Sequence, residues 1–276
     1  MSAPTESAHG APCWVSLITH DLKAAQDFYA TVLGWEYRPG FGRDEYVVAS
    51  AGGTPVAGIG ALAHSMGFPV SWSAYFAVES ADKAADRIRE RGATVAVGPI
   101  EFGPGRVAWV ADQAGATFGI WEGRIDPEWR VGRGTGTPAW LELRTRDVFE
   151  SAIFYSEVLG WDVEPPDRCD MRYEHDQVFV RIDGRTVAGI RGGAVEAAPD
   201  PRVRPRWHVY FCVSDVDAAA ESAAAAGGMV VSPPRQGYYG REATVRDPEG
   251  GMFTVTSDQG TPDAEAAEAD TPATDL

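Results

Sequence analysis

The chain has 276 residues, of which 44% are hydrophobic and 23% are charged, so it is long enough for two domains of roughly 100–150 residues, each with its own core. A formal net charge of −16 argues against nucleic acid or an anionic membrane as the main partner, because both select clusters of Lys and Arg. The 3 scattered cysteines without a CxxC spacing indicate reduced thiols, and neither a signal peptide nor a transmembrane run stands out, so we expect a cytoplasmic protein.

In chain order, residues 1–11 are expected to be disordered, and the first strand covers residues 14–19. Asp21 then provides a helix N-cap, and Gly34 is placed to end the helix. Between them, one apolar stripe at helical spacing predicts the buried face, formed by Ala25, Phe28, Tyr29, Val32 and Leu33.

Further along, "YVVAS", "GGTPVAGIGA" and "AYFAV" predict strands, "SADKAADRIRERG" predicts a second helix, and two closing strands flank "ADQAG". Residues 12–124 therefore form a first module of two βαβββ units. After a linker over residues 125–137, the pattern returns as a second module, residues 138–258. A nine-residue insertion is placed near residues 197–206, and the acidic tail 259–276 is expected to be disordered.

Both modules carry "FY" and "LGW" in and after the first helix, and "DPEGG" precedes the last strand of the second. These motifs resemble the vicinal oxygen chelate superfamily, which includes glyoxalase I, extradiol dioxygenases, fosfomycin-resistance proteins and bleomycin-binding proteins. The resemblance covers residues 12–257. It implies an α+β fold in which duplicated βαβββ modules form cupped mixed β-sheets (the glyoxalase/bleomycin resistance/dioxygenase fold), with four units, two cups and a ligand in the cup.

In metal-using members of that superfamily, the ligands occupy defined positions on inward-facing strands. The matching positions here are Trp14, Ser73 and Gly119 in the first module and Trp140, His208 and Thr254 in the second. A divalent metal requires three or more His or carboxylate ligands, and these positions supply one. We therefore expect no metal cofactor, and an unexpected metal site would have to draw on residues such as Glu142 or His175.

Since residues two apart on a strand share a face, the residues beside these positions are expected to line the cup. The predicted ligand-binding set is Trp14, Ser16, Tyr75, Trp121, Trp140, Glu142, Arg144, His208 and Tyr210. Such a lining is typical of a pocket for a bulky, largely aromatic molecule. The alternative is that Trp14 and Trp140 are core residues of cups that bind nothing. Trp35, Trp72, Trp161 and Trp207 recur in both modules and are predicted to be structural.

His208 is the residue at a metal position whose side-chain type titrates near neutral pH, and His208 and Glu142 are the candidate catalytic residues. It is either a general base or ligand contact, or a satisfied core histidine. Glu142 and Arg144 share a strand face and are expected to orient a ligand.

The sequence thus predicts a metal-independent binding protein for an antibiotic or polyketide intermediate, in natural-product biosynthesis or self-resistance. Two alternatives stay open. One is an enzyme of lyase, dioxygenase or hydroxylase type, which uses a divalent metal or His208 as acid and base. The other is a module that acts only in protein contacts. The ligand, the cup that is used and the formation of a homodimer are also left open.

Overall fold

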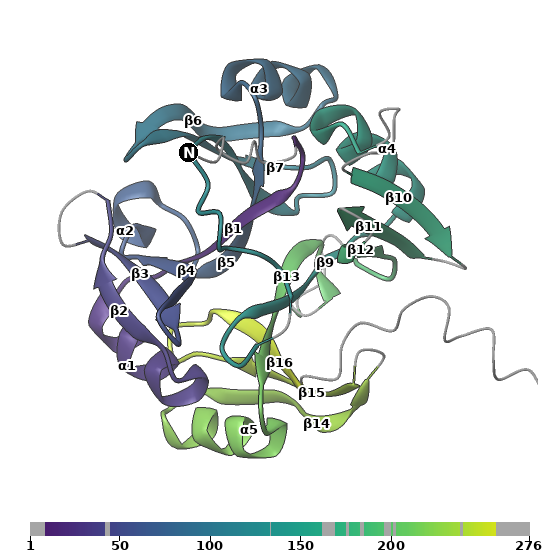
Figure 1. Cartoon of the computed structure of the whole chain (residues 1–276). Helices are drawn as coiled ribbons and strands as arrows, with labels where there is room; N and C mark the ends of the chain where they lie inside the picture. Colours follow the sequence, from purple (N-terminus) through teal and green to yellow (C-terminus); the bar gives the residue numbers. More distant parts are fainter. Residues whose placement is uncertain are drawn as a thin grey trace, which may run out of the picture.

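The computed structural model describes residues 9–41, 45–132, 134–161, 169–174, 177–182, 185–195, 200, 203–237 and 240–257 (Figure 1). The predictions for residues 1–8, for the tail 259–276 and for His175 lie outside these ranges, as does much of the segment 197–206.

The first eight-stranded sheet has the order β2-β3-β4-β1-β5-β8-β7-β6. Its central strands β1 and β5 are antiparallel, with Trp14 opposite Tyr75, while β4 and β8 run parallel to their central neighbours. The strands are β1 (Pro12–Ile18), β2 (Glu36–Pro39), β3 (Tyr46–Ala51), β4 (Thr54–Gly60), β5 (Ser71–Ala77), β6 (Thr94–Phe102), β7 (Gly105–Ala111) and β8 (Thr117–Gly123).

The second sheet repeats this topology in the order β10-β11-β12-β9-β13-β16-β15-β14. Its strands are β9 (Pro138–Arg144), β10 (Cys169–Glu174), β11 (Gln177–Ile182), β12 (Arg185–Arg191), β13 (Arg206–Val213), β14 (Met229–Gly237), β15 (Gly240–Arg246) and β16 (Met252–Ser257). The predicted α+β fold of duplicated βαβββ modules, each with its own mixed sheet, is confirmed.

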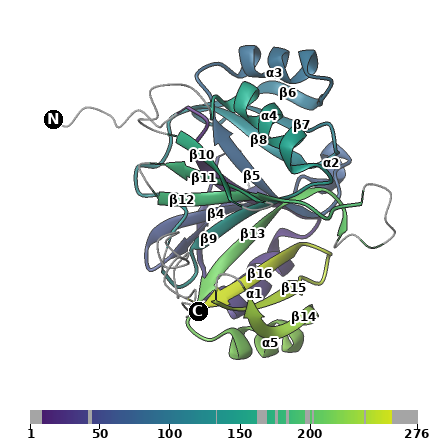
Figure 2. The ribbon, with the colours of Figure 1, turned by 90° about the vertical axis from the view of Figure 1, so that its right-hand side faces the viewer.

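The helices are α1 (Leu22–Leu33), α2 (Ala63–Met66), α3 (Ala81–Glu90), α4 (Val148–Leu159) and α5 (Val216–Ala225). The Asp21 side chain accepts a hydrogen bond from the first turn of α1, and Gly34 ends this helix in the left-handed region at φ 70°, as predicted. Helices pair across the modules, since α1 packs against α5 and α3 packs against α4 (Figures 1 and 2).

One continuous hydrophobic core lies on the helix side of both sheets and joins the modules. The Tyr29 hydroxyl donates to Asp247 Oδ2 at 2.8 Å and accepts from Trp72 Nε1 at 2.9 Å. In the symmetric contact, Tyr155 donates to Asp112 Oδ2 at 3.0 Å. A structural role is confirmed for the four recurrent tryptophans, which are all buried in this core: Trp35, Trp72, Trp161 and Trp207.

The concave faces lie outside this core and carry small apolar clusters of their own. The fold therefore holds two separate cups, the first formed by β1 to β8 and the second by β9 to β16. Among the described helices, no helix has the length and apolar character needed to cross a membrane.

Candidate functional site

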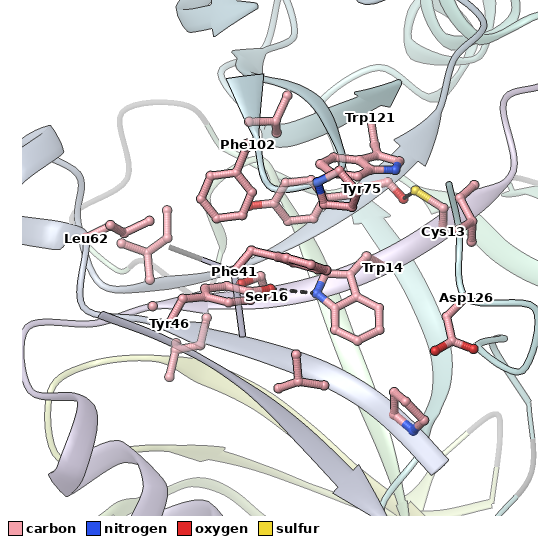
Figure 3. A pocket seen from close by; sticks show the side chains of 18 of the residues that line it. Cys13, Trp14, Ser16, Phe41, Tyr46, Leu62, Tyr75, Phe102, Trp121 and Asp126 are labelled. Carbon is pink, nitrogen blue, oxygen red and sulfur yellow. Dashed lines mark hydrogen bonds between the residues drawn. The ribbon is translucent and has the colours of Figure 1, made fainter. Parts of the chain in front are cut away.

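The first cup encloses a cavity of about 390 Å³, which lies within the range of about 300–1,000 Å³ typical of small-molecule sites. Its lining comes entirely from the first module and the start of the linker, between Cys13 and Asp126. Figure 3 shows the rings of Phe102, Tyr75 and Trp121 along one side and those of Tyr46 and Trp14 along the other. Flat apolar faces on two sides of a cavity suit a planar ring system.

Two strand glycines make room for these rings. A Cβ on Gly119 of β8 would lie 2.1 Å from the Tyr75 ring, and a Cβ on Gly58 of β4 would lie 1.8 Å from the Tyr46 hydroxyl oxygen. Neither glycine has a positive φ that requires glycine, so the close approach is the reason for its presence. The rings occupy space that a side chain at either position would fill.

Hydroxyl groups gather on the wall of this cavity. Trp14 Nε1 donates to the Tyr46 hydroxyl at 2.9 Å, and Trp109 Nε1 donates to the Tyr75 hydroxyl at 2.8 Å. The Ser16 side chain lies near both tyrosine hydroxyls and lowers the pKa of each. Burial raises the pKa of both phenols, so both remain protonated at neutral pH and provide O–H donors.

Charged and reactive groups lie apart from these hydroxyls. Arg38 and Arg124 are exposed and line the cavity together with the half-buried Asp126, and the ring of Phe41 is 51% exposed. Burial raises the pKa of the Cys13 thiol, which donates to the Tyr75 carbonyl oxygen at 3.4 Å. This cysteine is therefore a protonated, unreactive thiol at neutral pH.

The second cup has a different interior. Its described pocket is only about 70 Å³ and is lined by Arg and Glu side chains together with His208, Tyr210 and two threonines. Glu142 is 2% exposed and accepts from Arg144 Nε at 2.6 Å. His208 Nε2 is hydrogen-bonded to Thr254 Oγ1 at 2.9 Å.

Burial, followed by the charges of Arg206 and Arg144, holds the pKa of His208 well below its usual value. A neutral imidazole with such a low pKa is a weak general base at neutral pH. The geometry therefore gives little support to an acid–base role for His208 with Glu142.

Matching positions explain why the cups differ. Trp109 and Trp121 of the first cup correspond to Thr244 and Thr256 of the second. Trp140, which corresponds to Trp14, is only 1% exposed and clusters with Phe179 and Tyr210. Its ring fills the second cup and does not line the described pocket.

The predicted ligand-binding residues thus fall into two groups. The first cup brings together Trp14, Ser16, Tyr75 and Trp121, and the second brings together Glu142, Arg144, His208 and Tyr210. Sequence reasoning missed Tyr46, Trp109 and Phe102. The glycines of the strand "VAGIGA" were the available signal, because a glycine within a strand often marks the close approach of another group.

Known proteins resemble this chain in sequence, and others share its topology. The glyoxalase-like domain model matches residues 140–256, and the bleomycin resistance protein-like N-terminal model matches residues 13–52. The protein named "Putative glyoxylase CFP32" of Mycobacterium bovis is 32% identical over 268 residues, which cover 92% of this chain and 97% of that protein. This chain belongs to the vicinal oxygen chelate superfamily.

A second relative within the superfamily is the anthracycline biosynthesis protein DnrV of Streptomyces peucetius. It is 33% identical over 269 residues, which cover 91% of this chain and 94% of DnrV. Among solved structures, the Mn(II)-bound glyoxalase from Novosphingobium aromaticivorans matches with a TM-score of 0.57 and 17% identity, covering 92% of this chain and 84% of its own. An extradiol ring-cleaving dioxygenase from B. fuscum matches with a TM-score of 0.58 and 17% identity, covering 94% and 76%. These structures share the fold.

The metal that the superfamily implies does not fit the residues of this chain. In the first cup, the Tyr75 ring lies where a ligand side chain at position 119 would project. In the second cup, His208 is joined at the metal positions by Trp140 and Thr254, which are not metal ligands of the usual kind. Within the described ranges, no group of three His, Cys, Asp or Glu residues is placed to hold a metal ion. Metal independence itself stays a prediction.

Proposed function

We propose that the first cup binds a planar aromatic molecule that carries a keto or quinone oxygen, such as an intermediate of aromatic polyketide biosynthesis, and that it does so without a metal. The observation that carries the proposal is the aromatic cavity of about 390 Å³ in the first cup, whose lining includes Trp14 at a position that the family resemblance assigns to a metal ligand. The relation to DnrV, which is named as an anthracycline biosynthesis protein, supports a role in natural-product biosynthesis.

The hydroxyl cluster is the reason for expecting a keto or quinone oxygen on the ligand. Trp14, Trp109, Tyr46, Tyr75 and Ser16 offer five N–H and O–H protons, whereas the contacts among them use at most four, namely the two indole hydrogen bonds and one contact of Ser16 with each tyrosine. One donor is therefore left over for an acceptor atom in the cavity. An aromatic hydrocarbon would leave this buried donor unsatisfied, at a cost of roughly 1–3 kcal/mol, whereas a carbonyl oxygen would accept its hydrogen bond.

Tryptophan fluorescence tests the proposal, because three indole rings line the cavity and their emission should be quenched by a stacked dye. We expect 1,4-dihydroxyanthraquinone to quench emission saturably at micromolar concentration. Trp109→Thr, which introduces the residue of the second cup, should raise the dissociation constant about tenfold through loss of one ring contact and one hydrogen bond.

Trp140→Phe is the matched control, since Trp140 lies in the second cup and should leave the dissociation constant unchanged. The proposal fails if the dye does not quench saturably, or if both substitutions weaken binding equally.

A further inference from the structure

The small pocket of the second cup concentrates positive charge in a chain whose net charge is −16. Its lining includes two glutamates, Glu142 and Glu242, and four arginines: Arg144, Arg191, Arg206 and Arg235. The glutamates form ion pairs with Arg144 at 2.6 Å and with Arg235 at 3.0 Å. The charge of Asp200 also attracts Arg206 and raises its pKa. Even with this third carboxylate, guanidinium groups outnumber carboxylates among the described residues of this pocket.

The strand register increases the repulsion within this cluster. Arg206 of β13 lies directly opposite Arg144 of β9, and like charges at opposed positions of an antiparallel pair are destabilising. Burial and then the charge of Arg144 lower the pKa of Arg206 to about 10. An anion bound between the two guanidinium groups would be attracted to both of them and would offset their mutual repulsion.

Neutral donors complete the pocket. The ring of His208 is hydrogen-bonded through Nε2, and Thr254 continues this chain to Thr244 at 2.9 Å. The other ring nitrogen, Nδ1, is buried and has no hydrogen-bond partner among the described residues, although the whole side chain is 4% exposed. A buried polar atom of this kind generally has a partner, so the polar cluster around His208 is incompletely satisfied among the described residues.

The fold does not require these charges. The positions of the first cup that match Glu142, Arg144, Arg206 and His208 hold Ser16, Ile18, Ser71 and Ser73. The same sheet is thus built with no ionisable side chain at any of the four places. Burying a charged cluster costs free energy that a stability role alone would not repay, which favours a ligand.

We propose that the second cup is a binding site for a small oxyanion, a carboxylate or phosphate group held between Arg144 and Arg206, with the exposed Arg191 and Arg235 at the mouth. A volume of about 70 Å³ accommodates a group of this size and excludes a ring system. The site is separate from the aromatic cavity and does not depend on the function proposed for the first cup.

Isothermal titration calorimetry of the full chain at pH 7 and constant ionic strength tests the site, with inorganic phosphate and acetate as separate probes. We expect one saturable site for at least one probe. The probe that binds with the lower dissociation constant shows whether the site prefers a phosphate or a carboxylate group. Arg206→Gln should raise the dissociation constant of that probe about tenfold or more. Arg172→Gln, which removes a 55% exposed arginine of the same module outside the pocket, should leave the dissociation constant unchanged.

Arg235→Gln is a second variant in case Arg206→Gln does not fold, because the Arg235 side chain is 65% exposed. This substitution should also weaken binding of the anion, because it removes one positive charge and leaves the negative charge of Glu242 without its ion pair. Absence of a saturable site for both probes would overturn the proposal, as would equal binding by the variants and the parent chain. Trp109→Thr should not change anion binding, so failure at one cup is distinguishable from failure at the other.

Discussion

Gly58→Ala isolates the wall of the first cup with the smallest substitution available. The added Cβ would lie 1.8 Å from the Tyr46 hydroxyl oxygen and 2.9 Å from Trp14 Nε1, the two atoms joined by the hydrogen bond on this wall. The Tyr46 ring must therefore move into the cavity or away from Trp14. Overpacking costs about 1–3 kcal/mol and the lost hydrogen bond about 0.5–1.5 kcal/mol, so we expect a loss of roughly 2–4 kcal/mol in unfolding free energy.

Gly189→Ala is the matched control in the second module, where Gly189 holds the corresponding position in "VAGIR". Its Cβ would lie 2.7 Å from the Trp140 ring, so this substitution also overpacks a cup. Both variants should unfold at a lower temperature than the parent chain. Only Gly58→Ala should weaken binding of 1,4-dihydroxyanthraquinone, by about tenfold, because it displaces both Tyr46 and the Trp14 contact.

Thermal unfolding measures the loss of stability, and the fluorescence titration measures the loss of affinity. Unchanged affinity in Gly58→Ala would mean that the Tyr46 and Trp14 side chains do not contact the ligand. An equal loss of affinity in Gly189→Ala would mean that binding responds to general loosening of the fold. Either result would refute the assignment of the ligand to the first cup.

Three other substitutions test further parts of the structure. Ser16→Ala removes one hydroxyl proton and the Ser16 contacts of both tyrosines, so the O–H groups of Tyr46 and Tyr75 are both left for the ligand. The preference for a hydroxyanthraquinone over the hydroxyanthracene of the same skeleton should therefore rise about tenfold in the same titration, and an unchanged or lower preference would contradict the donor count. Tyr29→Phe leaves Asp247 and Trp72 Nε1 without their shared partner, and chemical denaturation should show a loss of roughly 2–3 kcal/mol, whereas a loss near zero would exclude the inter-module role. The folded-state pKa of His208 lies well below 6.5, so below that pH the unfolded chain binds a proton that the folded chain does not. Stability should therefore fall between pH 7 and pH 5, and His208→Gln should reduce this slope; an identical slope would show that His208 is not responsible.

Much of the fold was predictable because its signals are local and occur twice. Asp21, the apolar stripe of the first helix and Gly34 mark one helix from start to end, and Asp147 and Gly160 mark its copy. The contact between modules was not predictable in the same way. Tyr29 and Asp247 are 218 positions apart, and their hydrogen bond depends on how two finished sheets pack.

The sequence predicted that aromatic and polar side chains line the cups, but it predicted only partly which of them lie together. Strand alternation correctly places Trp14 and Ser16 on the same cavity wall. It cannot distinguish Trp14, which lines a cavity, from Trp140, which is buried at the corresponding position. That difference arises from neighbouring strands, where Trp109 of the first module is replaced by Thr244 in the second and the available space is divided differently.

The position of the core explains how the two cups became so different. Contacts that join the modules, including Tyr29 with Asp247 and Tyr155 with Asp112, lie in the core on the helix side of the sheets. Residues that point to the concave faces contribute little to this core, so substitutions there change a cup without separating the modules. One sheet can thus carry indole and phenol rings while its copy carries arginines.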